Sequence, residues 1–321
     1  MPPAEPSLAA LPRPWLRYFL ATRPAFLSVT LVAALLGLAT AKLGGVALEP
    51  LKATLTALFA MVAHAGVNVI NDYHDARNGA DAANTERIFP FTGGSRFIQN
   101  GVLSLKATGL FGYGLLAAVI PAGLWLAFNS APGLILIGLA GLLVGWAYSA
   151  PPLALMSRGV GEAAVAAGFL LIVMGADFVQ RGGFSFLPLA AGLGYALLVA
   201  NILFINQFPD FHGDQAAGKR TLVVRLGPLG ARWGYPLIAV LAHGWLILAI
   251  GRRELPPVAA IAALSLLFCL KAARLLMAHA ADPGELEPAI KLTILAANLH
   301  GALLAACLFL ARPAPVGAWA W

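Results

Sequence analysis

The sequence predicts an all-α, polytopic membrane protein built as a bundle of about nine transmembrane helices. Hydrophobic residues make up 60% of the 321 residues and charged residues only 11%, whereas a soluble domain is about a quarter charged. The mean hydropathy is +0.81. Nine apolar runs approach the ~20 residues that a helix needs to cross a bilayer. So few charges exclude a water-soluble surface.

The predicted spans follow one another along nearly the whole chain. Gly and Pro inside them are compatible with membrane helices, because neighbouring helices satisfy the freed backbone groups. We treat residues 1–321 as a single domain, with a possible repeat boundary near 150–160. A short interfacial helix is expected over Pro14–Leu20. The nine spans are residues 25–43, 51–71, 103–127, 131–149, 160–180, 186–206, 230–250, 256–279 and 288–311.

Lysine and arginine are distributed unevenly between the two sides of the predicted bundle. With a cytoplasmic N-terminus, only six of the 21 cationic residues lie on the outer side, which leaves 15 on the cytoplasmic side, where such residues concentrate. We therefore expect an integral protein of the bacterial inner membrane. Two long connections, about 72–102 and 207–229, would form a cytoplasmic cap over an active site. The six outer cations are Lys42, Lys52, Arg181, Arg252, Arg253 and Arg312.

A polar stretch, "NVINDYHDARNGAD" (68–81), directly follows the second predicted span. If that helix continues through the stretch, Asn68, Asp72 and Asp75 lie at i, i+4 and i+7, on one face. Charged side chains are scarce elsewhere in this chain. Their concentration here indicates a functional site.

A second stretch of the same kind, "INQFPDFHGD" (205–214), follows the sixth span. Asn206, Asp210 and Asp214 recur at i, i+4 and i+8, again on one helical face. Pro209 removes a backbone donor and clashes with the preceding turn. The second stretch is therefore expected to be a kinked or restarted helix.

The carboxylates of both stretches stand at helix C-terminal ends. The helix dipole disfavours negative charge there by up to about 1 kcal/mol each, and like charges one turn apart add to this. Arg77 is the only cationic residue close in sequence to Asp72 and Asp75. A divalent cation most simply supplies the missing charge, and hard oxygen ligands favour Mg²⁺. A solvated helix end explains one such stretch, but less readily two.

The loops that follow both stretches contain groups suited to phosphate. The run from Thr92 to Arg96, "TGGSR", offers backbone amides, hydroxyls and a guanidinium, although such a run is also typical of a plain turn. Lys219 and Arg220 follow the second stretch. They can contact phosphate, or they can simply be part of the cytoplasmic excess of positive charge.

These residues resemble the UbiA superfamily of intramembrane aromatic prenyltransferases. The family carries an Asn-Asp-x-x-Asp motif after its second helix, which here reads Asn71-Asp72-Tyr73-His74-Asp75. It carries an Asp-x-x-x-Asp motif after its sixth helix, here Asp210 to Asp214. The resemblance covers nearly the whole chain. Gly79 and Asp81 complete the first motif as in the 1,4-dihydroxy-2-naphthoate prenyltransferases, and "AGKRTLVVRLG" fits the same branch.

The resemblance implies an enzyme that transfers a prenyl group from an allylic prenyl diphosphate to an aromatic acceptor of quinone biosynthesis, possibly 1,4-dihydroxy-2-naphthoate. It implies Mg²⁺ held by Asp72, Asp75, Asp81, Asp210 and Asp214, which would stabilise the leaving diphosphate. The apolar bundle would shield the allylic cation from water. Membrane lipid is an expected partner and nucleic acid is not.

The same resemblance suggests roles for further polar residues. Asn68, Asn71 and Asn206 would bind substrate beside the carboxylates. Arg23, in "TRPAF", would anchor an acidic acceptor or serve as a positive anchor at the membrane surface. Tyr148 would face the allylic cation or lie at the interface as an aromatic anchor.

Other polar residues inside the spans carry weaker expectations. His64, one turn before Asn68, can form a hydrogen bond near the site. His243 and His300 are expected to be packed or hydrogen-bonded. Asp177 is interpreted as a solvated helix end on the outer side. Finally, Cys269 and Cys307 form no metal or disulfide pattern.

Two other function classes fit the sequence less well. A transporter usually places ionisable groups at the bilayer midplane, whereas the carboxylates here gather at one side. Another lipid-phosphate transferase, of the CDP-alcohol type, would need an Asp-Gly-x-x-Ala-Arg cluster, which the sequence lacks.

Overall fold

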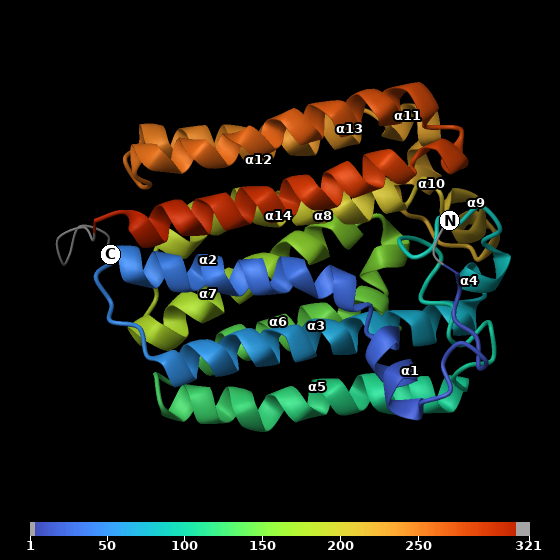
Figure 1. The fold of residues 1–321 in the computed structure, drawn as a ribbon, viewed down its shortest axis with the longest axis horizontal. Coiled ribbons are helices and arrows are strands. Elements are labelled where there is room, and N and C mark those ends of the chain that lie inside the picture. Colours follow the sequence, from blue (N-terminus) through green and yellow to red (C-terminus); the bar gives the residue numbers. More distant parts are fainter. Residues whose placement is uncertain (1–3, 313–321) are drawn as a thin grey trace.

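The computed structural model describes residues 4–312, which fold into helices and connecting loops (Figure 1). The long helices run side by side along the long axis of the molecule. This confirms the all-α bundle. The long helices are α2 (Leu27–Leu43), α3 (Pro50–Asn78), α5 (Leu105–Phe128), α6 (Leu134–Ser149), α7 (Gly161–Arg181), α8 (Leu187–Asn206), α12 (Gly234–Gly251), α13 (Leu266–His279) and α14 (Glu287–Leu310).

Eight helices in residues 4–312 are long and apolar enough to cross a membrane. The remaining predicted span, 131–149, is also a helix, α6, but this helix is only 16 residues long. The N-terminal 3-10 turn η1 (Pro24–Phe26) extends α2, and η3 (Pro257–Ser265) extends α13 to spanning length. The predicted bundle of about nine helices is therefore confirmed, with eight helices of spanning length and one shorter apolar helix in the expected place.

Short helices gather at one end of the bundle, which we call the mouth end (Figure 1). The expected interfacial segment is helical as α1 and presents Trp15 and Phe19 on its exposed side. The short elements of the chain are α1 (Pro14–Ala21), α4 (Ala80–Ala83), η2 (Leu155–Arg158), α9 (Phe211–Ala216), α10 (Leu222–Leu226), α11 (Pro228–Ala231) and η4 (Pro283–Glu285).

The two acidic stretches leave their helices in different ways. Helix α3 continues through the first stretch, as predicted, and ends when Gly79 adopts a left-handed conformation with φ +84°. Glycine favours this ending because it lacks a Cβ. Helix α8 ends at Asn206, and α9 restarts at Phe211 after a turn that contains Pro209. The prediction of a restarted helix is confirmed.

Asp177 differs from its prediction. It is only 1% exposed rather than solvated. The Arg181 guanidinium donates to both carboxylate oxygens at 2.7 and 2.8 Å, and the Thr40 hydroxyl donates at 3.0 Å. The prediction rested on the position of Asp177 at the end of a span. It missed the neighbouring α2, which covers this side chain and supplies Thr40 as a hydrogen-bond donor.

The buried histidines of the second half form a hydrogen-bonded network. The Ser265 hydroxyl lies 2.9 Å from His243 Nε2 and 3.1 Å from His300 Nδ1. Ser265 is the last residue of η3, so the network links α12, η3 and α14. The expectation of hydrogen-bonded core histidines is confirmed. Cys269 and Cys307 are buried free thiols.

Candidate active site

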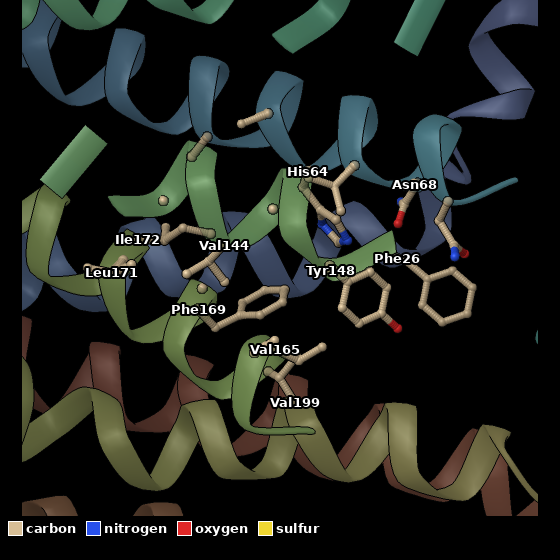
Figure 2. Close-up of a pocket in the computed structure, with 18 of the residues that line it drawn as sticks. Phe26, His64, Asn68, Val144, Tyr148, Val165, Phe169, Leu171, Ile172 and Val199 are labelled. Atoms are coloured by element: carbon tan, nitrogen blue, oxygen red, sulfur yellow. The ribbon is translucent and has the colours of Figure 1, made fainter. Parts of the chain in front are cut away.

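A cavity of about 530 Å³ runs from the mouth end into the bundle between α3, α5, α6 and α7. This volume falls in the range of small-molecule sites. Its walls combine an apolar interior with a polar mouth. Figure 2 shows Asn68 and Tyr148 towards one end of this stretch and Leu171 and Ile172 towards the other.

The inner part of the cavity is lined by aliphatic and aromatic side chains. Phe169 and Val165 of α7 and Val144 of α6 point into it (Figure 2). Ile120 of α5 and Leu139 of α6 line the cavity and are also 50% and 60% exposed. The wall between α5 and α6 therefore also forms part of the outer, lipid-facing surface.

Most of the predicted site residues meet at the mouth of this cavity, although they come from elements far apart in the sequence. Residues of α3, α4, α6, α8 and α9 and of the loops that follow α1, α8 and α9 share one lining. The predicted residues that line the cavity are Arg23, Asn68, Asn71, Asp75, Asp81, Tyr148, Asn206, Asp210, Asp214 and Lys219. The helical-face argument for the second stretch was incomplete, because the helix breaks there, yet its three residues converge on one cavity.

Asp72 lies beside this cavity but does not line it. Its buried carboxylate is paired with the Arg23 guanidinium and accepts the Ser95 backbone N–H at 3.3 Å. The backbone amides of the "TGGSR" loop were expected to wrap phosphate. The Ser95 amide instead holds this loop against the first motif.

Lys219 connects the two motifs. Its ammonium lies 2.7 Å from Asp75 Oδ1 and 3.1 Å from Asp214 Oδ1. Burial disfavours the ammonium form, but the two carboxylates outweigh this and raise the pKa of Lys219. Asp72 and Asp75 therefore have protein cations, Arg23 and Lys219. The sequence argument considered only cations close along the chain and therefore missed both of them, because Arg23 and Lys219 are distant in sequence.

Asp81 is turned towards the mouth by the short helix α4, which packs against α9. Its carboxylate accepts from Gln99 Nε2 at 3.2 Å. Gly94, with φ +76°, lies so close that a Cβ there would be 2.3 Å from Asp81 Oδ2. Burial, followed by the charges of Asp75 and Asp72, raises the pKa of Asp81 well above its usual value.

Asp210 is the corresponding carboxylate of the second motif. Asn84 Nδ2 donates to its Oδ1 at 2.5 Å. Burial and the neighbouring Asp214 raise the pKa of Asp210 to about 7. Burial also raises the pKa of Asp214, against the effect of Lys219. Such crowding indicates that the site favours additional positive charge.

Two predicted phosphate contacts lie away from the cavity. Arg96 is buried, donates to the backbone carbonyl of Asp81, and lies 3.8 Å from Glu5. Arg220 is exposed beside the buried Lys219 and does not line the cavity. The interpretation of Arg220 as simple surface charge agrees better with this position. Arg96 supports the loop that carries Gly94.

Three polar residues near the site were missed by the sequence reasoning. Asn84 ties the first loop to Asp210. Gln207 lines the cavity, accepts the Val223 backbone N–H at 3.3 Å and donates to the buried Glu162. Gln207 directly follows Asn206, and this position next to a motif residue could have identified it as a site residue. The sequence could not place Glu162 near the site, because it lies at the start of a different span.

The remaining polar lining residues hold the mouth in shape. Asn68 Nδ2 donates to the Thr22 carbonyl at 3.0 Å, and Asn71 Nδ2 donates to Asp75 Oδ2 at 3.1 Å. His64 Nδ1 lies 2.6 Å from the Thr30 hydroxyl, and its ring stands edge-on to Phe169. His64 is thus hydrogen-bonded, as expected, and it also lines the cavity.

The donor chemistry suits a hard divalent cation. Asp75, Asp81, Asp210 and Asp214 share one mouth, and carboxylate oxygens are the ligands that Mg²⁺ prefers. Within residues 4–312, no group of three His, Cys, Asp or Glu side chains forms a ready-made metal site.

Comparison with known proteins decides the family. The model of the UbiA prenyltransferase family matches residues 30–286. This chain belongs to the UbiA prenyltransferase family. The predicted superfamily is thereby confirmed, and the matched region contains both aspartate motifs of this UbiA protein.

Similar curated relatives include 1,4-dihydroxy-2-naphthoate octaprenyltransferases. The Mycobacterium leprae enzyme is 32% identical over 193 residues, which cover 59% of this UbiA protein and 62% of the relative. The Bacillus subtilis enzyme is 25% identical over 235 residues, covering 70% and 71%. The match thus spans less than two thirds of the mycobacterial relative. These names agree with the predicted naphthoate branch.

Solved structures share the fold of this UbiA protein. A UbiA homolog from Aeropyrum pernix K1 superposes with a TM-score of 0.60 at 17% identity, covering 86% of this chain and 96% of that one. A homolog from Archaeoglobus fulgidus, whose structure contains GPP and Mg²⁺, has a TM-score of 0.57 at 18% identity, covering 90% and 99%.

Proposed function

We propose that this protein transfers a prenyl group from an allylic prenyl diphosphate to an aromatic quinone precursor, with 1,4-dihydroxy-2-naphthoate as the acceptor. One observation carries the proposal: four aspartates surround the mouth of a cavity whose interior is apolar. A prenyl diphosphate has the same division into a charged head and an apolar tail. The naphthoate relatives support the choice of acceptor.

The diphosphate head would lie at the carboxylate-lined mouth. Asp75, Asp81, Asp210 and Asp214 would hold Mg²⁺, which supplies Lewis-acid stabilisation of the leaving diphosphate when bound. Asp72 holds the 92–96 loop beside these ligands through Ser95. Lys219 and Arg23 line the same mouth and would donate charge-assisted hydrogen bonds to phosphate oxygens.

The apolar part of the cavity would serve the prenyl chain and the cation. The C–O bond breaks, the diphosphate leaves with the electron pair, and an electron-rich ring carbon attacks the allylic cation and then loses its proton. The apolar walls around Phe169 keep water away from the cation. Tyr148, in the wall between mouth and interior, would stabilise positive charge with its ring face.

We further propose that the mouth end faces the cytoplasm, in the inner membrane of a bacterium, and that membrane lipid surrounds the bundle. Fifteen of the 21 cationic residues support this orientation. The exposed leucines and isoleucines of α5, α6 and α12 support a lipid surround. Reactivity of single cysteines introduced at the two ends, tested with an impermeant reagent on intact cells, would check the orientation.

The decisive experiment is a donor-by-acceptor assay on purified protein. Prenyl diphosphates of several lengths are combined with 1,4-dihydroxy-2-naphthoate and with other phenolic acceptors in Mg²⁺. Mass spectrometry identifies the products, and released diphosphate is measured in parallel. A prenylated naphthoate with equal diphosphate release is expected. Flux of a solute into liposomes with no diphosphate release would instead support a transporter.

A further inference from the structure

A second cavity, of about 320 Å³, lies at the mouth end beside the first. Lys219 lines both cavities and so forms part of the wall between them. Three separate parts of the chain meet around the second cavity. They are the end of α3 with Arg77, the segment from Ser149 to Ser157, and the turn at Gly218.

The charges around this second cavity are of one sign. Arg77 and Lys219 line it, and its lining contains neither Asp nor Glu. The Arg77 guanidinium stacks 5.6 Å from the centre of the Tyr73 ring, and Nη1 lies 3.5 Å from the Tyr73 hydroxyl. Its other donors remain available to a ligand.

Lys219 also retains donor capacity. An ammonium group has three N–H donors, and those of Lys219 contact one oxygen of Asp75 and one of Asp214. One donor is therefore left for an acceptor in either cavity. Asp75 and Asp214 contribute to the lining of the first cavity but not of the second.

Ser149 provides an independent sign of a ligand. It is only 3% exposed, it lines the second cavity, and its hydroxyl has no hydrogen-bond partner in the part of the chain that the structure describes. A buried hydroxyl without a partner costs about 1–3 kcal/mol. Such a group, in the same cavity lining as two cations, is suited to an oxyanion with several acceptor oxygens.

We propose that the second cavity binds an inorganic oxyanion of the phosphate type, and that it receives the diphosphate released in the first cavity before the product reaches the solvent. The identity of the anion as the reaction product rests on the proposed function. The apolar interior of the first cavity excludes a multiply charged product. The shared Lys219 offers one continuous contact between the two cavities.

Binding can be tested without turnover. Full-length protein in EDTA is titrated calorimetrically with inorganic diphosphate and with inorganic phosphate. Saturable binding is expected, with Arg77→Gln weakening it by about tenfold, which corresponds to about 1.4 kcal/mol. Ser149→Ala is expected to weaken it about threefold. The control is Lys106→Gln, which removes one exposed charge from the start of α5 and should leave the affinity unchanged.

A kinetic arm separates this site from the donor site. Diphosphate should inhibit prenyl transfer with a component that excess prenyl diphosphate does not relieve. Arg77→Gln should raise its inhibition constant but leave the KM of the donor unchanged. Purely competitive inhibition that is the same in wild type and Arg77→Gln would overturn the proposed exit role.

The two proposals can fail separately. Arg77-dependent binding in EDTA together with absent prenyl transfer would keep the oxyanion site and remove the proposed function. Prenyl transfer together with equal diphosphate affinity in wild type, Arg77→Gln and Ser149→Ala would keep the proposed function and remove the oxyanion site. The thermal midpoints of the variants are compared first, and Ser149→Ala carries the test if Arg77→Gln does not fold.

Discussion

Replacing Gly94 by alanine tests whether the catalytic site depends on the position of Asp81. An added Cβ would lie 2.3 Å from Asp81 Oδ2 and 2.7 Å from its Cγ, closer than a side chain tolerates. The carboxylate or the loop must therefore move by about 1 Å, and a misplacement of that size can lower activity by about 100-fold. Overpacking adds about 1–3 kcal/mol of lost stability.

Gly101 supplies the matched control. It also has a positive φ, +66°, but a Cβ there meets nothing within 4 Å. The left-handed backbone costs alanine about 1–2 kcal/mol at either position. Gly101→Ala should therefore lose stability alone, whereas Gly94→Ala should also lose activity and Mg²⁺ affinity.

The assay compares kcat/KM and the Mg²⁺ concentration for half-maximal prenyl transfer in both variants, with thermal midpoints measured in the same detergent. We expect kcat/KM to fall about 100-fold in Gly94→Ala and to stay within about threefold of wild type in Gly101→Ala. Equal activity and equal Mg²⁺ dependence in the two variants would refute the reasoning that contact with Gly94 positions Asp81.

Three further predictions concern charge and shape. Because the pKa of Asp210 is raised to about 7, the affinity for Mg²⁺ should fall as the pH drops from 8 to 6, and an affinity that stays constant over this range would contradict the prediction. The stability of the metal-free protein should instead rise as the pH falls from 7 towards 4, because the folded state binds a proton that the unfolded state does not. Lys219→Met leaves two buried carboxylates without their cation and should cost about 3 kcal/mol or more, with Lys106→Met as the control in thermal unfolding. Gly141→Leu places a side chain in the cavity wall. It should lower activity on long prenyl donors at least about tenfold more than activity on a ten-carbon donor. Gly114→Leu, on the exposed side of α5, is the control and should leave the ratio of long-donor to ten-carbon-donor activity unchanged.

The membrane fold could be read from the sequence because its signals are local. Apolar length is a property of consecutive residues, so eight of the nine spans are helices of spanning length. The shortfall in α6 arises because the chain enters turns at both of its ends, after Ser130 and at Ala150. A single domain over 1–321 with a repeat boundary near 150–160 stays a prediction, and residues 1–3 and 313–321 lie outside the described structure.

The composition and the two aspartate stretches alone determined the membrane class, the family resemblance and the end of the bundle where the candidate site lies. Only the tertiary structure decided which charges meet. Arg23 pairs with Asp72 across 49 positions, and Lys219 bridges Asp75 and Asp214. The adjacent Arg220 faces solvent instead. Side-chain direction in a loop depends on turns and on contacts with distant elements, and neighbouring residues of like charge carry no local signal that tells them apart.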